Sequence, residues 1–535
     1  MSADLAILGA RVRTLDPARP FATAVAMADR VITAVGDDAE VRDACDARTE
    51  IVDGRGMAIV PGLVDCHIHP MWASDFAVGV DTSACKDRDA LAAALHTERE
   101  RVGPGAVVRA WAVDYAHFAD GLDGADLERL AGGPALAVFF DLHTYLATPE
   151  VLAMAGVTGP EAFADASEIV VRDGRPTGEL REFSAFFRVA DALPGAGEDG
   201  RRARVVEVLR ELNASGLAGA HVMDGSPETF ALLRELEARD ELTMRLVVPL
   251  WVKPEHDEER LADYVARGGE HGRLWRGGVA KFFIDGVVET GTAWLEEPDT
   301  RGQGTKPFWP SEATYAATVQ RFARAGFQCI THAVGDRAVR AALDAYRAAG
   351  PPAAPGRGAH RVEHLETLGD ATLARLAAEG VAASMQPLHM QWREADGGDE
   401  WAVRLGPERT DRAFRTGDLL RSGALLPLGS DWPVAPSDPR YGMAWARLRR
   451  HPGRPGESAF GPEQVLGALD ALAGYTSTAA AVVGESDAGG RIAPGRRADL
   501  TAFAADPVDT PADDLVALPV RLTVVGGRVV HAAGA

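Results

Sequence analysis

One alternation runs through most of this chain: a short apolar run that ends in a polar cluster, followed by a longer stretch of helical character. FQCITHAVGD (327–336) precedes RAVRAALDAYRAAG, and HRVEHLE (360–366) soon precedes ATLARLAAEG. This pattern is typical of βα units around a parallel sheet. Repeated over roughly 420 residues, where about 250 is usual, it predicts a (β/α)8 barrel. We expect the extra length in loops near 71–135, 150–200 and 390–420.

The two ends of the chain have a different pattern. Their short apolar runs are broken by Gly and Asp, which is typical of small strands joined by tight turns. We therefore predict an α/β fold class: a TIM-like (β/α)8 barrel with a small discontinuous β-sandwich domain formed by both chain ends. The predicted boundaries are 1–60 and 485–535 for the small domain and 61–484 for the barrel.

Composition excludes several classes of partner. Of 535 residues, 46% are hydrophobic and 25% are charged, which predicts a sizeable buried core. Asp and Glu number 78 against 56 Lys and Arg, so a net charge of −22 repels nucleic acids and anionic membranes. The chain has no basic start followed by an apolar run, and no stretch of about 18 apolar residues. We expect a cytoplasmic protein with neither nucleic acid nor membrane as partner.

The first chemical signal is a pair of histidines at the end of a strand-like run. AIVPGLVD leads directly into Cys66-His67-Ile68-His69. Residues two apart on a strand project to the same face, so His67 and His69 can offer two imidazole nitrogens to one metal. The carboxyl end of a barrel strand is also where barrel active sites are built.

Three further strand-like runs end in a residue that can bind metal: His332, His364 and Asp431. Each has a plain alternative, because a histidine can be a hydrogen-bonded core residue and Asp431 can be a turn or helix-cap residue before Pro433. Packing alone would place Val, Ile or Leu at these positions. Polar groups at the equivalent ends of four units therefore favour a metal site.

Lys281 lies in the apolar run Val279–Asp285, where an unpaired ammonium is costly. Burial would depress its pKa and leave a nucleophilic amine. A structural salt bridge, for example with Asp285 or a neighbouring strand, is the alternative interpretation.

The order HxH, Lys, His, His, Asp along successive strands resembles the amidohydrolase superfamily with a binuclear metal centre. The similarity runs from VPGLVDCHIH to GRIAPGRRADLTAF and so spans nearly the whole chain. Within it, KFFIDGVVETGTAWL, HAVGDRAV and RVEHLE look like the subgroup that includes N-substituted formamide deformylases.

This resemblance implies a role for each residue of the series. His67 and His69 would hold the more buried ion, and His332 and His364 the other. Lys281, carboxylated by carbon dioxide to a carbamate, would bridge the two divalent ions. Zinc is the first candidate for both ions, and manganese, cobalt and iron also suit these ligands.

The resemblance also implies the reaction. Asp431 would ligate metal, accept the proton of the metal-bound water and pass it to the leaving nitrogen, as the catalytic residue. The expected outcome is cleavage of an amide-type C–N bond by a metal-bound hydroxide, in a small-molecule N-formyl or N-acyl amine. A homodimer is implied by resemblance only.

Four weaker candidates for substrate contacts come from segments that line the pocket in this subgroup. Each has an ordinary alternative in a core position or a surface salt bridge. They are Trp111, His143, Glu182 and His221.

Two other functions remain open from the sequence. A mononuclear deaminase of an aminated heterocycle would need a Glu three positions after His332, but Ala-Val-Gly-Asp follows there, and Lys281 would have no purpose. A non-catalytic barrel that serves as a binding protein would be expected to lose ligands, whereas every expected ligand is present.

Overall fold

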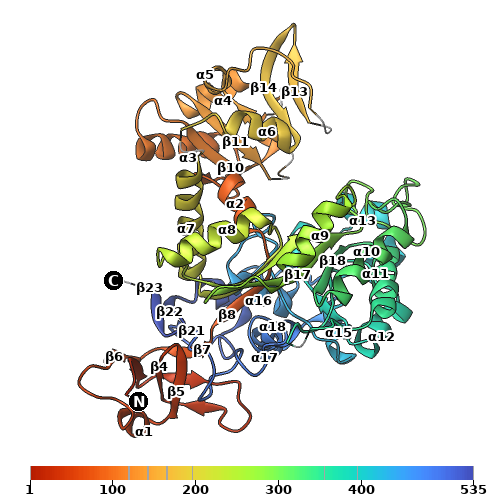
Figure 1. The fold of residues 1–535 in the computed structure, drawn as a ribbon. Helices are drawn as coiled ribbons and strands as arrows, with labels where there is room; N and C mark the ends of the chain where they lie inside the picture. Colours follow the sequence, from red (N-terminus) through yellow and green to blue (C-terminus); the bar gives the residue numbers. More distant parts are fainter. Residues whose placement is uncertain are drawn as a thin grey trace. The chain divides into compact units, whose positions relative to one another are not determined.

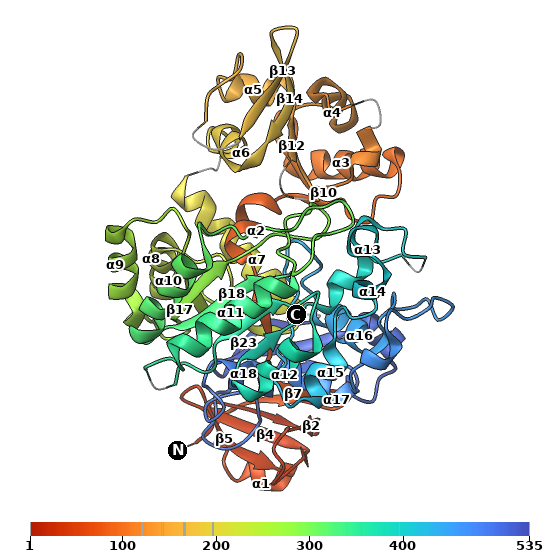
Figure 2. The same cartoon turned by 90° about the vertical axis from the view of Figure 1, so that its right-hand side faces the viewer.

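The computed structural model describes residues 2–118, 121–140, 142, 144–163, 167–194, 197–354, 356–394 and 396–533 (Figures 1 and 2). The chain divides into two compact units, one made of 1–69 with 209–535 and the other of 70–208. None of the helices in the described ranges is long and apolar enough to cross a bilayer.

Seven parallel strands form the barrel sheet of the first unit. In spatial order they are β20 (Ala382–Ser384), β19 (Arg361–His364), β18 (Gln328–Ala333), β17 (Trp275–Phe283), β16 (Arg245–Trp251), β15 (Leu217–Val222) and β8 (Leu63–Ile68). Every residue of β15, β18, β19 and β20 is buried. Such continuous burial is expected of parallel strands that are covered on both faces.

An eighth segment, 425–431, closes the barrel between β20 and β8. Met385 N donates to Pro427 O at 3.1 Å on one side, and Cys66 N donates to Leu428 O at 3.1 Å on the other. Pro427 has no N–H to contribute to a ladder, so the segment makes an isolated bridge rather than a regular strand. The predicted (β/α)8 barrel is confirmed, with an irregular eighth strand.

Helices cover the outside of the barrel, and Figure 2 shows α10 and α11 beside β17 and β18. Their starts follow from the sequence: Ser226, for example, accepts a hydrogen bond from Thr229 N, and Pro227 occupies the first turn of α8. The helices of this unit are α1 (Asp38–Arg42), α8 (Pro227–Ala238), α9 (Glu258–Ala266), α10 (Glu312–Arg324), α11 (Asp336–Ala349), α12 (Asp370–Ala378), α13 (Glu400–Leu405), α14 (Pro407–Thr410), α15 (Thr416–Arg421), α16 (Pro439–Leu448), α17 (Ala468–Gly474) and α18 (Ser477–Val482). A 3-10 helix, η3 (Pro387–Trp392), follows β20, and α7 (Glu198–Ala214) is the stretch in which the chain passes from the second unit to the first.

Both ends of the chain build the small β domain, as predicted. One sheet has the order β5 (Val31–Gly36), β4 (Ala24–Ala28), β1 (Leu5–Leu8), β6 (Glu50–Asp53), and the other the order β23 (Arg528–Ala532), β22 (Val520–Val525), β21 (Leu500–Phe503), β7 (Ala58–Pro61), β2 (Arg11–Arg13), β3 (Phe21–Ala22). The C-terminal β21 pairs antiparallel with the N-terminal β7, so blue and red strands lie side by side in Figure 1. Ile7 and Met27 of the first sheet share one core with Leu500 and Val524 of the second.

Residues 70–208 form a unit with its own core, whereas the sequence analysis expected loops over most of this stretch. Its sheet has the order β13 (Glu168–Arg172), β14 (Arg175–Arg181), β12 (Thr144–Ala147), β11 (Ala135–Phe139), β10 (Val108–Val113), β9 (Val80–Asp81). Its helices are α2 (Pro70–Phe76), α3 (Arg88–Val102), α4 (Gly124–Ala131), α5 (Pro149–Met154) and α6 (Glu182–Ala190). The rings of Phe76, Tyr145 and Phe186 pack against one another in its interior. The aromatic and aliphatic residues of this stretch are sufficient for a core, which an insertion of plain loops would lack.

Candidate active site

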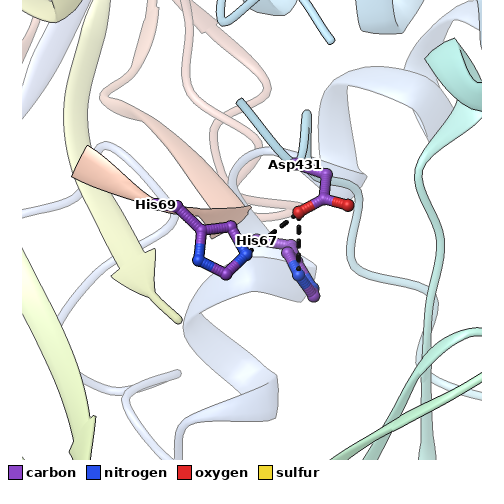
Figure 3. Close-up of side chains that lie close together, drawn as sticks. All are labelled: His67, His69 and Asp431. Atoms are coloured by element: carbon purple, nitrogen blue, oxygen red, sulfur yellow. Dashed lines mark ion pairs between the residues drawn. The ribbon is translucent and has the colours of Figure 1, made fainter. Parts of the chain in front are cut away.

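Strand β8 and the segment 425–431 bring two histidines and an aspartate together. Oδ1 of Asp431 lies 3.2 Å from Nε2 of His67 and 3.1 Å from Nε2 of His69 (Figure 3). The backbone fixes this approach, because Asp431 N donates to His67 O at 2.7 Å. A Cβ on Gly429 would lie 2.5 Å from His67 N, so only glycine allows the segment to run this close to β8.

His364 lies at the centre of the histidine cluster. Its ring centroid is 4.7 Å from that of His67, 4.3 Å from that of His332 and 5.6 Å from that of His389. Both of its ring nitrogens are buried, and neither has a hydrogen-bond partner among the described residues. His364 also has a φ of 75°, a region that few non-glycine residues adopt and that recurs at functional sites.

His389 is a member of the cluster that the sequence analysis missed. It follows β20 on η3, and its Nε2 lies 3.4 Å from Oδ2 of Asp431. Its Nδ1 faces Oε1 of Glu366 at 3.5 Å, and the other oxygen of Glu366 accepts from Trp401 Nε1 at 2.7 Å. His364, His389 and Asp431 form a group that could hold a metal ion, and so do His67, His69 and Asp431. The sequence signal available for His389 was its position just after a barrel strand, which is the criterion that identified His332.

Lys281 is fully buried in β17, as the apolar run around it predicts. Its Nζ has no hydrogen-bond partner in the described part of the chain, and burial lowers its pKa to about 8. The alternative salt bridge with Asp285 is not formed. The Asp285 carboxylate instead accepts from the backbone N–H groups of Trp294, Val334 and Gly335.

His332 is the penultimate residue of the neighbouring strand β18. Its ring stacks on Phe283 at 4.1 Å, and its Nε2 lies 3.2 Å from Gly286 O. Nζ of Lys281 lies 5.1 Å from the centroid of the same Phe283 ring. The structure thus brings the predicted series together at one end of the barrel: His67, His69, Lys281, His332, His364 and Asp431.

The electrostatics of His332 and His364 suit a cation, whereas Asp431 and Glu366 raise the pKa of His389 to about 9 in the absence of an ion. Burial lowers the pKa of His332 to about 3 and the pKa of His364 well below its usual value, so both rings are neutral at neutral pH. Neutral imidazoles and a carboxylate are the donors that zinc and related divalent ions prefer. The unpartnered nitrogens of His364 and Lys281 are also unfavourable unless a ligand contacts them. These residues fit a divalent metal site.

The four weaker substrate candidates are distributed differently. His221 lies in β15, where its Nδ1 faces Nη1 of Arg361 at 2.8 Å inside the barrel. Trp111 (β10) and Glu182 (α6) belong to the unit 70–208, and His143 lies outside the described residues. Their contacts with substrate stay predictions.

The chain is similar to several known proteins over nearly its whole length. The chain is 26% identical over 520 residues to the protein YtcJ of Bacillus subtilis, covering 95% of this chain and 96% of that one. It is 26% identical over 553 residues to the N-substituted formamide deformylase of Arthrobacter pascens, covering 98% and 97%. An uncharacterized metal-dependent hydrolase from Pyrococcus horikoshii has the same fold, with a TM-score of 0.74, 20% identity and coverage of 95% and 99%. The amidohydrolase family pattern matches residues 50–531, and the chain therefore belongs to the amidohydrolase family.

Proposed function

We propose that this chain is a metal-dependent hydrolase that cleaves an amide-type C–N bond of an N-formyl or N-acyl amine. The observation that carries the proposal is the position of Asp431, whose two oxygens face different histidine groups. Oδ1 faces His67 and His69, and Oδ2 faces His389. One carboxylate thus lies between two candidate ion positions.

Divalent ions bound in this cluster would supply Lewis acidity, which makes water a better proton donor and a carbonyl a better electrophile. The residues of the chain do the rest. Four histidines would hold and orient the ions, because packing fixes their buried rings: His67, His69, His332 and His364. Asp431 can accept a proton from the attacking water at one carboxylate oxygen and deliver it to the leaving nitrogen. Release of a neutral amine from a C–N bond needs that second proton transfer.

We propose that Lys281 carries a carbamate. A neutral amine attacks carbon dioxide, a C–N bond forms, one proton is released, and the side chain becomes an anion. This replaces a buried cation without a hydrogen-bond partner by a carboxylate that cations can neutralise. The place of Nζ beside the histidine cluster supports this assignment, because Lys281 and His332 share contact with the Phe283 ring.

Three large apolar side chains at the same end of the barrel support a substrate with an apolar N-substituent. Val287, Phe308 and Trp392 are 39%, 48% and 42% exposed. Phe308 is tied to the end of β17 by its N–H bond to Ile284 O, and the Trp392 ring lies 5.5 Å from that of His389. Exposed apolar groups next to a polar cluster are typical of a ligand pocket. The name of the Arthrobacter relative points to the same class of N-substituted substrate.

The test combines metal analysis with substitution of Lys281. We expect about two ions per chain. After incubation with isotope-labelled bicarbonate, we expect the label to appear in a carbamate on Lys281. Lys281→Ala should lose bound metal and activity toward N-formyl amines, while Lys253→Ala, an exposed lysine beside Trp251, should keep both. A wild-type protein without stoichiometric metal, or full metal content and activity in Lys281→Ala, would contradict the proposal. Ammonia release from aminated heterocycles, with no turnover of acylated amines, would favour the deaminase instead.

A further inference from the structure

A chain of four buried side chains crosses the interior of the barrel below the histidine cluster. Nδ1 of His67 lies 2.8 Å from Oε2 of Glu363, and the other oxygen of Glu363 accepts from Arg361 Nε at 2.9 Å and Nη2 at 2.7 Å. Nη1 of Arg361 lies 2.8 Å from Nδ1 of His221. All four side chains have at most 4% exposure, so water does not compete for these bonds.

Arg361 links several strands of the barrel at one level. Besides Glu363 on its own strand β19 and His221 on β15, its Nη2 donates to Cys66 O of β8 at 2.7 Å. Residues 361 and 363 are two apart on the strand, so both side chains project to the same face. A planar guanidinium with five N–H donors can hold three such partners at once, which a lysine ammonium cannot do in the same geometry.

The hydrogen bond to Glu363 determines which nitrogen of His67 faces the site with a lone pair. An ionised carboxylate can only accept, so Nδ1 of His67 carries a hydrogen, and in the neutral ring Nε2 then carries the lone pair. That Nε2 is 3.2 Å from Oδ1 of Asp431, which is also an acceptor. Two acceptors at this distance repel each other unless a cation lies between or beside them. The arrangement therefore orients His67 for a metal ion.

We propose that Glu363 and Arg361 are positioning residues that fix the ring and tautomer of His67 and so set the metal affinity of the His67, His69 and Asp431 group. His221 is the far end of this chain, where it accepts from Arg361. The inference rests on the proposed function in one respect, that this group binds a divalent ion. Outer partners of metal-binding histidines usually change metal affinity by roughly 10–100-fold when they are replaced.

The experiment is a competition between apo-protein and a chromophoric chelator for zinc and cobalt. We expect Glu363→Gln and Arg361→Lys to bind more weakly than wild type by about 10-fold or more, and the visible spectrum of the cobalt form to change. The matched control is Glu379→Gln, which removes the carboxylate of another Arg–Glu pair, with Arg375, on helix α12 and its C-cap. This control should bind metal as wild type does.

Thermal unfolding of the apo-proteins distinguishes a variant that does not fold from a variant that folds but no longer positions His67. If Glu363→Gln does not fold, His221→Leu removes the acceptor of Arg361 without touching a proposed ligand, and a several-fold loss of affinity is expected. Wild-type affinity and an unchanged cobalt spectrum in the folded variants would overturn the inference. If wild type itself binds neither ion, the proposed function fails instead.

Discussion

Nε2 of His389 lies 3.4 Å from Oδ2 of Asp431, while Oδ1 of the same carboxylate faces His67 and His69. Asp431 thus has histidine nitrogens on both sides, and the proton transfers proposed for it need a fixed orientation. His389 is itself fixed through Glu366, whose second oxygen accepts from Trp401.

The first prediction concerns this histidine. His389→Ala leaves Oδ2 of Asp431 without its neighbour, and we expect kcat to fall by about 100-fold or more, the usual size of a general acid–base contribution. His271→Ala, at an exposed position of the same unit, should leave the rate unchanged. Steady-state kinetics on one N-formyl amine measure both variants. A kcat of His389→Ala equal to that of wild type would mean that His389 does not contribute to the reaction.

The second prediction concerns metal removal. Dialysis against a chelator should abolish activity and lower the melting temperature, because an ion that binds only the folded state stabilises it. Zinc, manganese, cobalt or iron should restore both properties. Calcium should not, because it prefers all-oxygen ligand sets and this cluster offers mainly imidazole nitrogens. Full activity after the metal content has fallen to zero would contradict a metal-dependent mechanism.

The third prediction concerns substrate preference. Phe308→Ala and Trp392→Ala each remove a half-exposed apolar surface near the cluster. For substrates with a bulky apolar N-substituent we expect kcat/KM to fall by about 10-fold, the effect of losing roughly 1–2 kcal/mol of apolar contact. For a substrate with a small substituent the two variants should match wild type. Equal losses for both substrates would mean that these side chains do not contact the N-substituent.

The sequence was sufficient to predict the elements whose signal is local. The barrel follows from apolar runs such as 327–336, because burial on both faces requires them, and the sandwich follows from the hairpin patterns at the two ends. His67, His69 and Asp431 could be placed together because parallel strands align their carboxyl ends at one edge. The fold could therefore be predicted because its sequence patterns, the apolar runs and the hairpins, recur along the chain.

The features that sequence reasoning missed depend on partners far away in the chain. Glu363 and Arg361 were part of a motif quoted for His364, yet their role depends on His67, which is 296 residues from Glu363. His389 lies in an irregular segment after β20, where no periodicity marks which side chain turns inward. The unit 70–208 was obscured by its short strands, since β9 has two residues and β12 has four. Apart from the place of His389 after a barrel strand, this information lies in tertiary contacts rather than in local pattern.

The last prediction is a pH dependence of stability at Glu485. Burial opposes ionisation of this carboxyl, but its hydrogen bond and ion pair with Arg497, together with Arg276 Nε at 2.7 Å, lower its pKa to about 2. In the unfolded chain the pKa is about 4.3. The stabilisation is therefore fully present well above that value and is lost as the pH falls through the window between about 4.3 and 2.

Glu485→Gln should accordingly reduce the free energy of unfolding at pH 7 by on the order of 2–3 kcal/mol, the size that a shift of about two pKa units implies. The difference from wild type should shrink steadily as the pH is lowered below about 4, because the wild-type carboxyl then becomes protonated. Urea denaturation of the two proteins across this range measures the effect. Glu457→Gln removes a more exposed carboxylate from the same unit, paired with Arg454, and should have little effect at any pH. A destabilisation by Glu485→Gln that is the same at low pH as at pH 7 would mean that the Glu485 side chain acts through packing rather than through its charge.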